Sequence, residues 1–218
     1  MTQQTVSDDS AGGVLFPEYK TLYDLISREV AGLSDQQLDW ESGRWEWSKW
    51  SIRRQASHMS SLIYRWLLLR WGDQLFPDGG HGVDDVEGIA NSDDDRRMDE
   101  GRYWELQTIL DALSEGIDLA QRVLADRSVG YLRSHTIRRA QSAGPDLMAK
   151  AHPSGVTPAD EPGTSIVTLE WTMRHIYFEE TTHLYNIQRL KRAQGLRTVV
   201  EVPEVGYWVV DGWDRSEP

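Results

Sequence analysis

The strongest constraint on the fold of this chain is a helical periodicity that recurs in four separate segments. In each segment apolar residues follow one another at steps of three or four, which places them on one face of an α-helix. The segments run from Tyr19 to Leu33, from Ser51 to Trp71, from Tyr103 to Leu124 and from Ile166 to Leu190. Four amphipathic helices with few other regular patterns predict an all-α protein built as a four-helix bundle.

The ends of these helices divide the chain into three expected parts. Pro17 suits the first turn of the first helix, and Gly195 suits the C-cap of the fourth. We expect a flexible N-terminus over residues 1–15, a bundle over residues 16–195 and a C-terminal tail over residues 196–218 that packs on the bundle. The tail is rich in valine but interrupted by proline and glycine, so it fits either a short β-hairpin or an extended segment.

Two long connections separate the helices. Residues 73–100 contain eight Asp and two Glu against two Arg, together with several glycines. This composition predicts a solvated connection, and it lacks the regular acidic spacing of an EF-hand calcium loop. Residues 130–163 contain four prolines, so only residues 131–139 are expected to form a short helix, and the rest is expected to be loop.

Composition narrows the classes of protein. The chain has no cysteine, which excludes a disulfide framework, cysteine-ligated metal sites and a cysteine nucleophile. Its 23 Lys and Arg against 35 Asp and Glu give a net charge of −12, which disfavours binding to nucleic acid and to anionic membranes. No apolar run approaches the roughly 18 residues of a membrane span, and the N-terminus lacks a secretory signal. We expect a cytoplasmic protein that acts on a small molecule.

The fourth periodic segment carries the residues with the clearest chemistry. Its apolar stripe is interrupted by His175, Glu179, Glu180 and His183, and burying such groups without partners costs several kcal/mol. Glu179 and His183 are four apart, which puts both side chains on one helix face, where they can clamp a divalent cation. The alternative is that both glutamates are solvated and that His183 is a hydrogen-bonded core histidine.

Three stretches resemble one known superfamily. The entry Trp50-Ser51-Ile52, followed by a helix with His58, resembles the second-helix signature of the DinB-like (YfiT-like) metalloenzyme superfamily. The stretch 33–40 resembles that family's link between its first two helices. The run 179–190 is similar to its closing metal motif, in the Glu-x-x-x-His form of the mycothiol-dependent maleylpyruvate isomerase branch. The resemblance covers residues 16–193; that branch adds a second domain, which the short tail does not resemble.

The resemblance implies a metal site. It implies that His58, Glu179 and His183 are ligands of one divalent ion, with zinc expected first and nickel or iron also compatible. Glu180 is the alternative carboxylate, and His175, one turn before Glu179, could orient the carboxylate of that residue. The remaining histidines have no assigned role; these are His81, His135 and His152.

The resemblance also implies an activity. Relatives use a low-molecular-weight thiol in metal-assisted transfer or isomerisation, and a metal-bound hydroxide acting as a hydrolase would need the same ligands. Arg54, Arg65 and Arg174 are near enough in sequence to anchor a thiol. A non-haem iron oxygenase is compatible with the ligand types, whereas a ferritin-like di-iron site is excluded because only one Glu-x-x-His pair is present.

A non-catalytic function is the alternative from a different class. The protein would then be a metal-stabilised bundle that binds a small ligand or serves as a stress-related module. Six tryptophans fall within residues 40–71. They could line a ligand cleft or the face of a homodimer, or they could fill the core and the ends of the bundle.

Overall fold

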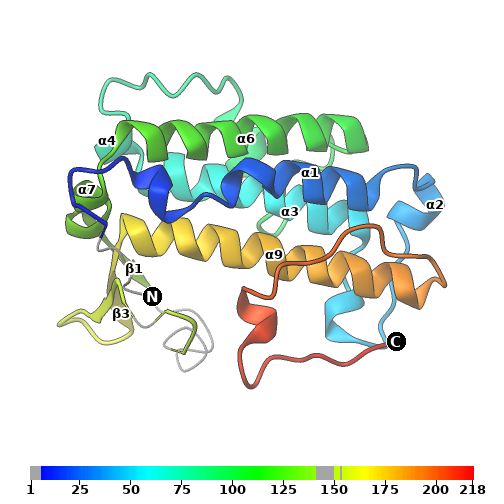
Figure 1. Cartoon of the computed structure of the whole chain (residues 1–218). Helices are drawn as coiled ribbons and strands as arrows, with labels where there is room; N and C mark the ends of the chain where they lie inside the picture. The colour runs from blue at the N-terminus through cyan, green and yellow to red at the C-terminus, as the bar shows by residue number, and fades with distance from the viewer. Residues whose placement is uncertain (1–5, 141–149, 153) are drawn as a thin grey trace.

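The computed structural model describes residues 6–140, 150–152 and 154–218, and over these residues the protein is mostly helical. Four long helices lie side by side along the molecule (Figure 1). They are α1 (Tyr19–Val30), α3 (Ile52–Tyr64), α6 (Leu106–Asp126) and α9 (Leu169–Ala193). Helices α1 and α3 each contact both α6 and α9, so the apolar faces of all four helices meet in one core.

The buried residues of these helices are those of the predicted stripes. In α1 they include Tyr19, Leu22 and Ile26. Helix α3 begins at the expected place because the Ser51 side chain accepts a hydrogen bond from the Arg54 amide. Almost every residue of α3 is buried, since it is packed against α6 and α9. It continues into a π-helical turn, η3 (Arg65–Arg70), and then into the short helix α4 (Gly72–Leu75).

The prediction of an all-α protein is incomplete, because the described residues also form a small antiparallel sheet. Its strands are β1 (Thr136–Ala140), β2 (Val156–Pro158) and β3 (Thr164–Thr168), in the order β1-β3-β2. The fourth helix therefore begins at Leu169 and not near Ile166, which lies in β3. The β-branched run before Leu169 alternates between buried and half-buried positions, and this period of two suits a strand.

The short helix expected over residues 131–139 is also only partly correct. The structure has α7 (Val129–Ser134), capped by the Ser128 side chain, and the chain then enters β1. At the other end of α9 the expected C-cap is confirmed. Gly195 has φ +73°, and the Leu196 amide donates to the Lys191 carbonyl at 2.9 Å, the pattern of a Schellman motif.

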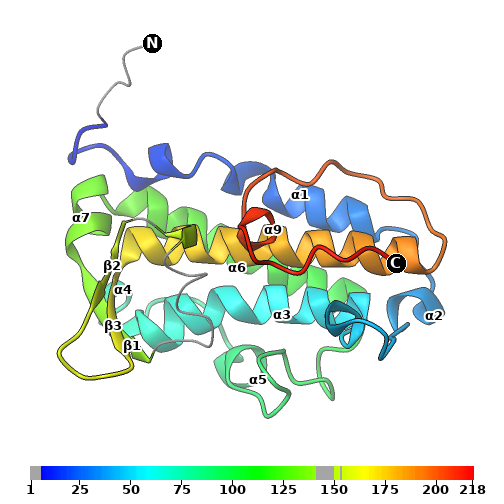
Figure 2. The ribbon, with the colours of Figure 1, turned by 90° about the horizontal axis from the view of Figure 1, so that it is seen from below.

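The acidic connection is folded against the core and is not simply solvated. It contains the short helix α5 (Val86–Ala90), and Ile89 and Met98 are buried. Helix α5 lies beside α3 (Figure 2). The Met98 amide donates to the Ser57 hydroxyl, and Arg54 forms an ion pair with Glu100. These contacts attach the connection to the helix that carries His58.

The two ends of the chain also pack on the helices. The tail takes the extended form with one 3₁₀ turn, η4 (Tyr207–Val209), and it contacts α9 (Figure 2). At the N-terminus, the 3₁₀ helix η1 (Gly12–Leu15) packs on α6, and Ala11 bridges to Ser128. Residues 1–5 of the segment expected to be flexible lie outside the described residues, and the contacts of residues 11–15 attach this part of it to the helices. Two further short elements precede α3; they are α2 (Asp35–Leu38) and η2 (Glu46–Ser48).

Among the helices that the structure describes, none combines the length and the apolar character needed to cross a lipid bilayer.

Candidate metal centre

The packing of α3 against α9 brings together the three residues expected to bind a metal. His58 lies on α3, and Glu179 and His183 lie one turn apart on α9. Each offers one ligand atom, and these atoms all lie within 4.8 Å of one another. Glu179 Oε2 is 3.4 Å from His183 Nε2 and 3.9 Å from His58 Nε2. Two atoms bound to one tetrahedral ion at about 2.1 Å lie about 3.4 Å apart, so the spacing fits a cation between them.

The other nitrogen of each imidazole is bound to a carbonyl oxygen. His58 Nδ1 lies 2.9 Å from the carbonyl oxygen of Arg96, and His183 Nδ1 lies 2.5 Å from Gln55 Oε1. A carbonyl oxygen only accepts, so Nδ1 carries a proton in both rings, and Nε2 is the nitrogen that faces Glu179. Metal-binding histidines are oriented by the same kind of contact.

The amide of Gln55 is itself oriented. Its Nε2 donates to the carbonyl oxygens of Trp47 and Trp50 at 3.4 and 3.5 Å, which directs its Oε1 toward His183. Trp50 also covers the site from one side, with its ring centroid 5.1 Å from that of His58. Sequence analysis did not identify either residue as part of the site, although Gln55 is one turn before His58 and Trp50 belongs to the Trp-Ser-Ile entry.

The charges of the three groups also favour a cation. Burial, and then the nearby His183, lowers the pKa of His58 to about 4, so this imidazole is neutral at pH 7. Burial alone would raise the pKa of Glu179, but the imidazoles of His183 and His58 outweigh it and hold this pKa well below the usual value. An ionised carboxylate and the Nε2 atoms of both imidazoles therefore converge. The Glu179 side chain is 26% exposed, which leaves an approach from solvent.

The other two candidates on α9 do not join the metal group. Glu180 is fully buried, and neither carboxylate oxygen has a hydrogen-bond partner among the described residues. Burial, followed by the nearby Glu179, raises the pKa of Glu180 well above its usual value. His175 Nδ1 is hydrogen-bonded to the Tyr207 hydroxyl, and its ring stacks on Trp171. No hydrogen bond or ion pair in the described structure joins His175 to Glu179, although each group acts on the pKa of the other through its charge.

His152, for which the sequence predicted no role, lies in the neighbourhood of His175 and Tyr207. His152 is buried, and its Nε2 lies 2.7 Å from the Tyr207 hydroxyl. Tyr207 has one proton, so it donates to one of the two imidazoles and accepts from the other. Burial lowers the pKa of His175 to about 4 and that of His152 to about 3. Both rings are therefore neutral at pH 7, and through the Tyr207 hydroxyl they join the tail to α9 and to His152. His81 and His135 lie outside this neighbourhood and contact Phe76 and Tyr131.

The three arginines considered as anchors have different surroundings. Arg54 forms ion pairs with Glu41 and Glu100, and Arg174 pairs with Glu170. Arg65 makes no ion pair within the described part of the chain, and its Nε is buried without a hydrogen-bond partner. Of the clustered tryptophans, three belong to the buried core; these are Trp47, Trp66 and Trp71.

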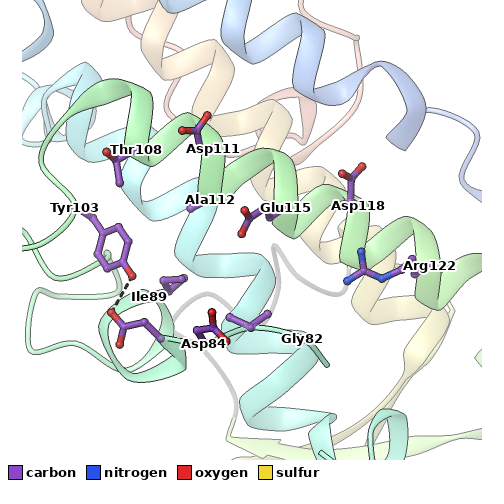
Figure 3. A pocket seen from close by; sticks show the side chains of 12 residues that line it. Gly82, Asp84, Ile89, Tyr103, Thr108, Asp111, Ala112, Glu115, Asp118 and Arg122 are labelled. Carbon is purple, nitrogen blue, oxygen red and sulfur yellow. Dashed lines mark hydrogen bonds between the residues drawn. The ribbon is translucent and has the colours of Figure 1, made fainter. Parts of the chain in front are cut away.

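A pocket of about 420 Å³ lies between the acidic connection and α6 (Figure 3), and none of the three candidate metal residues lines it. Its wall contains Asp84, Asp111, Glu115 and Asp118, with Arg122 at one side. None of these acids belongs to a possible metal group over the residues that the structure describes. The pocket is therefore separate from the candidate metal centre.

Comparison of the chain with protein-family models, with curated proteins and with solved structures finds no match. The candidate metal centre is therefore argued from its own geometry.

Proposed function

We propose that the protein binds one divalent metal ion through His58, Glu179 and His183. The observation that carries this proposal is the convergence of the three ligand atoms within 4.8 Å, with both Nδ1 atoms held by carbonyl oxygens. Zinc is the ion that we expect, and nickel or iron would accept the same nitrogen and oxygen ligands. Three protein ligands leave at least one coordination position for water or substrate, as in catalytic sites.

We propose further that the four long helices form a bundle of the DinB/YfiT-like type. In support, the ligands come from the second and fourth long helices, in the order that the resemblance implies. The Ser51 cap also lies within the Trp-Ser-Ile entry that carries the resemblance.

The proposed activity is that of a metal-dependent enzyme, either a thiol-dependent transferase or isomerase, or a hydrolase. A bound ion would supply a nucleophile at neutral pH by lowering the pKa of a coordinated thiol or water. The chain contributes the carboxylate of Glu179 and two oriented imidazoles. A chain without cysteine would take its thiol from solution, and the partly exposed side of Glu179 provides the approach.

Metal analysis tests the binding site. The full chain, loaded with zinc and dialysed, should retain about one equivalent per molecule. His58→Ala and His183→Ala each remove a ligand and should lower zinc affinity by more than the roughly 10–100-fold typical of an outer contact. His81→Ala, in the acidic connection and outside the site, is the matched control and should retain zinc. A wild-type protein that holds no stoichiometric metal under replete conditions contradicts the proposal.

An activity assay then separates the enzymes from the alternative. Zinc-loaded protein is incubated with a panel of low-molecular-weight thiols and electrophiles, and with ester and amide substrates, in the presence and absence of chelator. Turnover that chelator abolishes supports the enzyme. Bound metal without turnover, together with a lower Tm after metal removal, supports the non-catalytic metal-stabilised module.

A further inference from the structure

A strained turn beside the metal centre carries Arg96. The Arg97 amide donates to the Asp94 carbonyl at 2.7 Å, and the two residues between them have positive φ, +20° for Asp95 and +63° for Arg96. This is the pattern of a type I′ turn, in which glycine is preferred at the second central position because it has no Cβ to clash. An arginine there costs conformational free energy, so its side chain calls for an explanation.

The backbone of this turn orients one of the candidate ligands. The carbonyl oxygen of Arg96 accepts a hydrogen bond from His58 Nδ1 at 2.9 Å. A glycine at position 96 would provide the same carbonyl oxygen without the conformational cost. The orientation of His58 therefore explains the turn, but it does not explain the arginine side chain.

The Arg96 side chain extends over Trp50, the ring that covers one side of the metal centre. Its guanidinium lies 5.1 Å from the Trp50 centroid, and that centroid lies 5.1 Å from the ring of His58 and 6.3 Å from that of His183. Trp50 is half-buried and Arg96 is exposed, and the side chain of Glu179 is 26% exposed. Solvent thus reaches a carboxylate, an indole and a guanidinium that surround the same two imidazoles.

The two arginines next to Trp50 differ in their ion pairs. The Arg97 guanidinium lies 5.2 Å from the Trp50 centroid, but its side chain is only 11% exposed and pairs with Glu100 at 2.9 Å. Arg96 pairs with its neighbour Asp95 at 3.2 Å, and both side chains are more than half exposed. Exposed ion pairs contribute little to stability, so an anionic ligand can take the place of Asp95.

A second cation, Arg65, acts on the same centre. It follows His58 by seven residues, and its amide still donates to the Ser61 carbonyl as in a helix, so the two side chains lie near one face. Burial, and then the like charge of Arg96, lowers the pKa of Arg65 to about 10, while Glu179 acts in the opposite direction. The buried Nε of Arg65 has no hydrogen-bond partner in the described structure. An anion between the two guanidinium groups would relieve their repulsion.

We propose that the metal centre takes an organic anion whose oxyanion group is recognised by Arg96 and Arg65. One end of the ligand would occupy the open metal position, and its apolar part would lie along Trp50. Its carboxylate or phosphoryl oxygens would meet the guanidinium groups, which match their geometry. The net charge of −12 repels anions from the protein as a whole, so this local group of cations would be needed to bind one. The inference rests on the proposed metal site and names the class of its substrate.

Thiol binding to the cobalt-loaded full chain tests this inference. Cobalt accepts the same nitrogen and oxygen ligands as zinc, and its visible absorption changes when a thiolate binds. The probes are mercaptohexanoate, mercaptohexanol and aminohexanethiol, which share a thiol and an alkyl chain and differ in the charge at the far end. Wild type should bind mercaptohexanoate at least about tenfold more tightly than aminohexanethiol, with mercaptohexanol between them.

Variants identify the arginines. Arg96→Met keeps the carbonyl that orients His58, so the affinities for cobalt and for mercaptohexanol should not change. It should lower the preference for mercaptohexanoate over aminohexanethiol at least about threefold. Arg96→Glu should lower this preference further because it reverses the charge, and Arg65→Met should lower it as well. Arg28→Met, which removes an exposed arginine of α1, is the matched control and should keep the wild-type preference.

The possible results separate this inference from the proposed function. If the chain binds cobalt but prefers none of the probes, or if Arg96→Met and Arg65→Met both keep the wild-type preference, the inference is wrong and the metal site remains. Equal weakening of all three thiols by Arg96→Met would show that Arg96 has only a structural role, which also overturns the inference. If the chain binds no metal, the proposed function and the inference fail together.

Discussion

Two adjacent glutamates of α9 lie in different surroundings, and their charge states differ as a result. Glu179 lies 3.4 Å from His183 Nε2, and the neighbouring imidazoles outweigh burial and lower its pKa. Glu180 is rotated by about 100° around the helix and is fully buried, where burial, followed by Glu179, raises its pKa. Two consecutive residues of the helix thus differ: Glu179, the candidate ligand, is ionised, whereas the carboxyl group of Glu180 favours the neutral form.

Replacing Glu180 by methionine should stabilise the protein. The variant keeps an unbranched side chain of similar length and removes a buried polar group without a partner, which costs about 1–3 kcal/mol in proteins. Because the folded-state pKa of Glu180 is raised, wild-type stability is lost as pH rises from 4.5 through that pKa. Urea unfolding of the metal-free proteins at pH 7 and pH 8.5 measures the gain.

The matched control for this experiment is Glu115→Met, on the outer side of α6 in the acidic pocket. It should change stability by no more than about 0.5 kcal/mol, as surface substitutions usually do. A Glu180→Met variant that is less stable than wild type would mean that the carboxyl group makes a favourable interaction, and the interpretation of Glu180 would be wrong.

At the scale of elements, the pairing of α3 with α9 determines the site. Neither helix holds the three ligands alone, and the register between the helices places His58 against Glu179. The side chain of Gln55 reaches from α3 to His183 on α9. The packing of the two helices therefore also sets the orientation of the His183 ring. Beyond His58, the π-helical turn η3 carries Arg65 and Arg70, and such turns are frequent at functional sites.

Substituting Gln55 by methionine should weaken zinc binding by about 10–100-fold while all three ligands remain, because the proton of His183 Nδ1 loses its acceptor and the ring its orientation. Competition with a zinc chelator measures the affinity. Gln107→Met, an exposed change on α6 where the amide donates to Asp111, serves as control. Equal affinities for the Gln55 variant and wild type would show that His183 needs no such contact.

At the scale of the whole molecule, the tail and the helices are joined by buried polar contacts. Lys191 Nζ lies 2.6 Å from Glu29 Oε1, which connects α9 to α1. The Glu29 carboxylate also accepts from the amides of Val199 and Val200 in the tail. Arg189 donates to carbonyl oxygens near the C-terminus. Charged groups as well as apolar side chains thus hold the tail against the helices.

The substitution Lys191→Met should destabilise the protein by about 3–5 kcal/mol, because it leaves the Glu29 charge buried without its cation. Thermal and urea unfolding measure the loss. Lys20→Met, which removes an exposed lysine of α1, is the control and should change stability by no more than about 0.5 kcal/mol. A loss of similar size in both variants would show that the buried pair contributes nothing particular.

Local sequence was sufficient to predict the helices and to select three residues that the structure brings together. The apolar stripes of α1, α3 and α6 were predictable because helical periodicity depends only on neighbours along the chain. His58 was selected from the resemblance to a family motif, and Glu179 and His183 were selected from that resemblance and from their spacing of four residues. The strand before α9 was mistaken for part of the helix because its apolar residues, Ile166 and Val167, fit either period over so short a run.

Tertiary structure decided what each side chain faces. The sequence alone does not show that Glu180 is buried outside the candidate metal group, that Gln55 and Arg96 hold the imidazoles, or that Arg70 and Arg139 both lie over Trp66. These relations join residues from 38 to 128 positions apart, as in the contacts of His58 and His183. Burial and electrostatic environment depend on such distant neighbours, so they arise only when the helices pack.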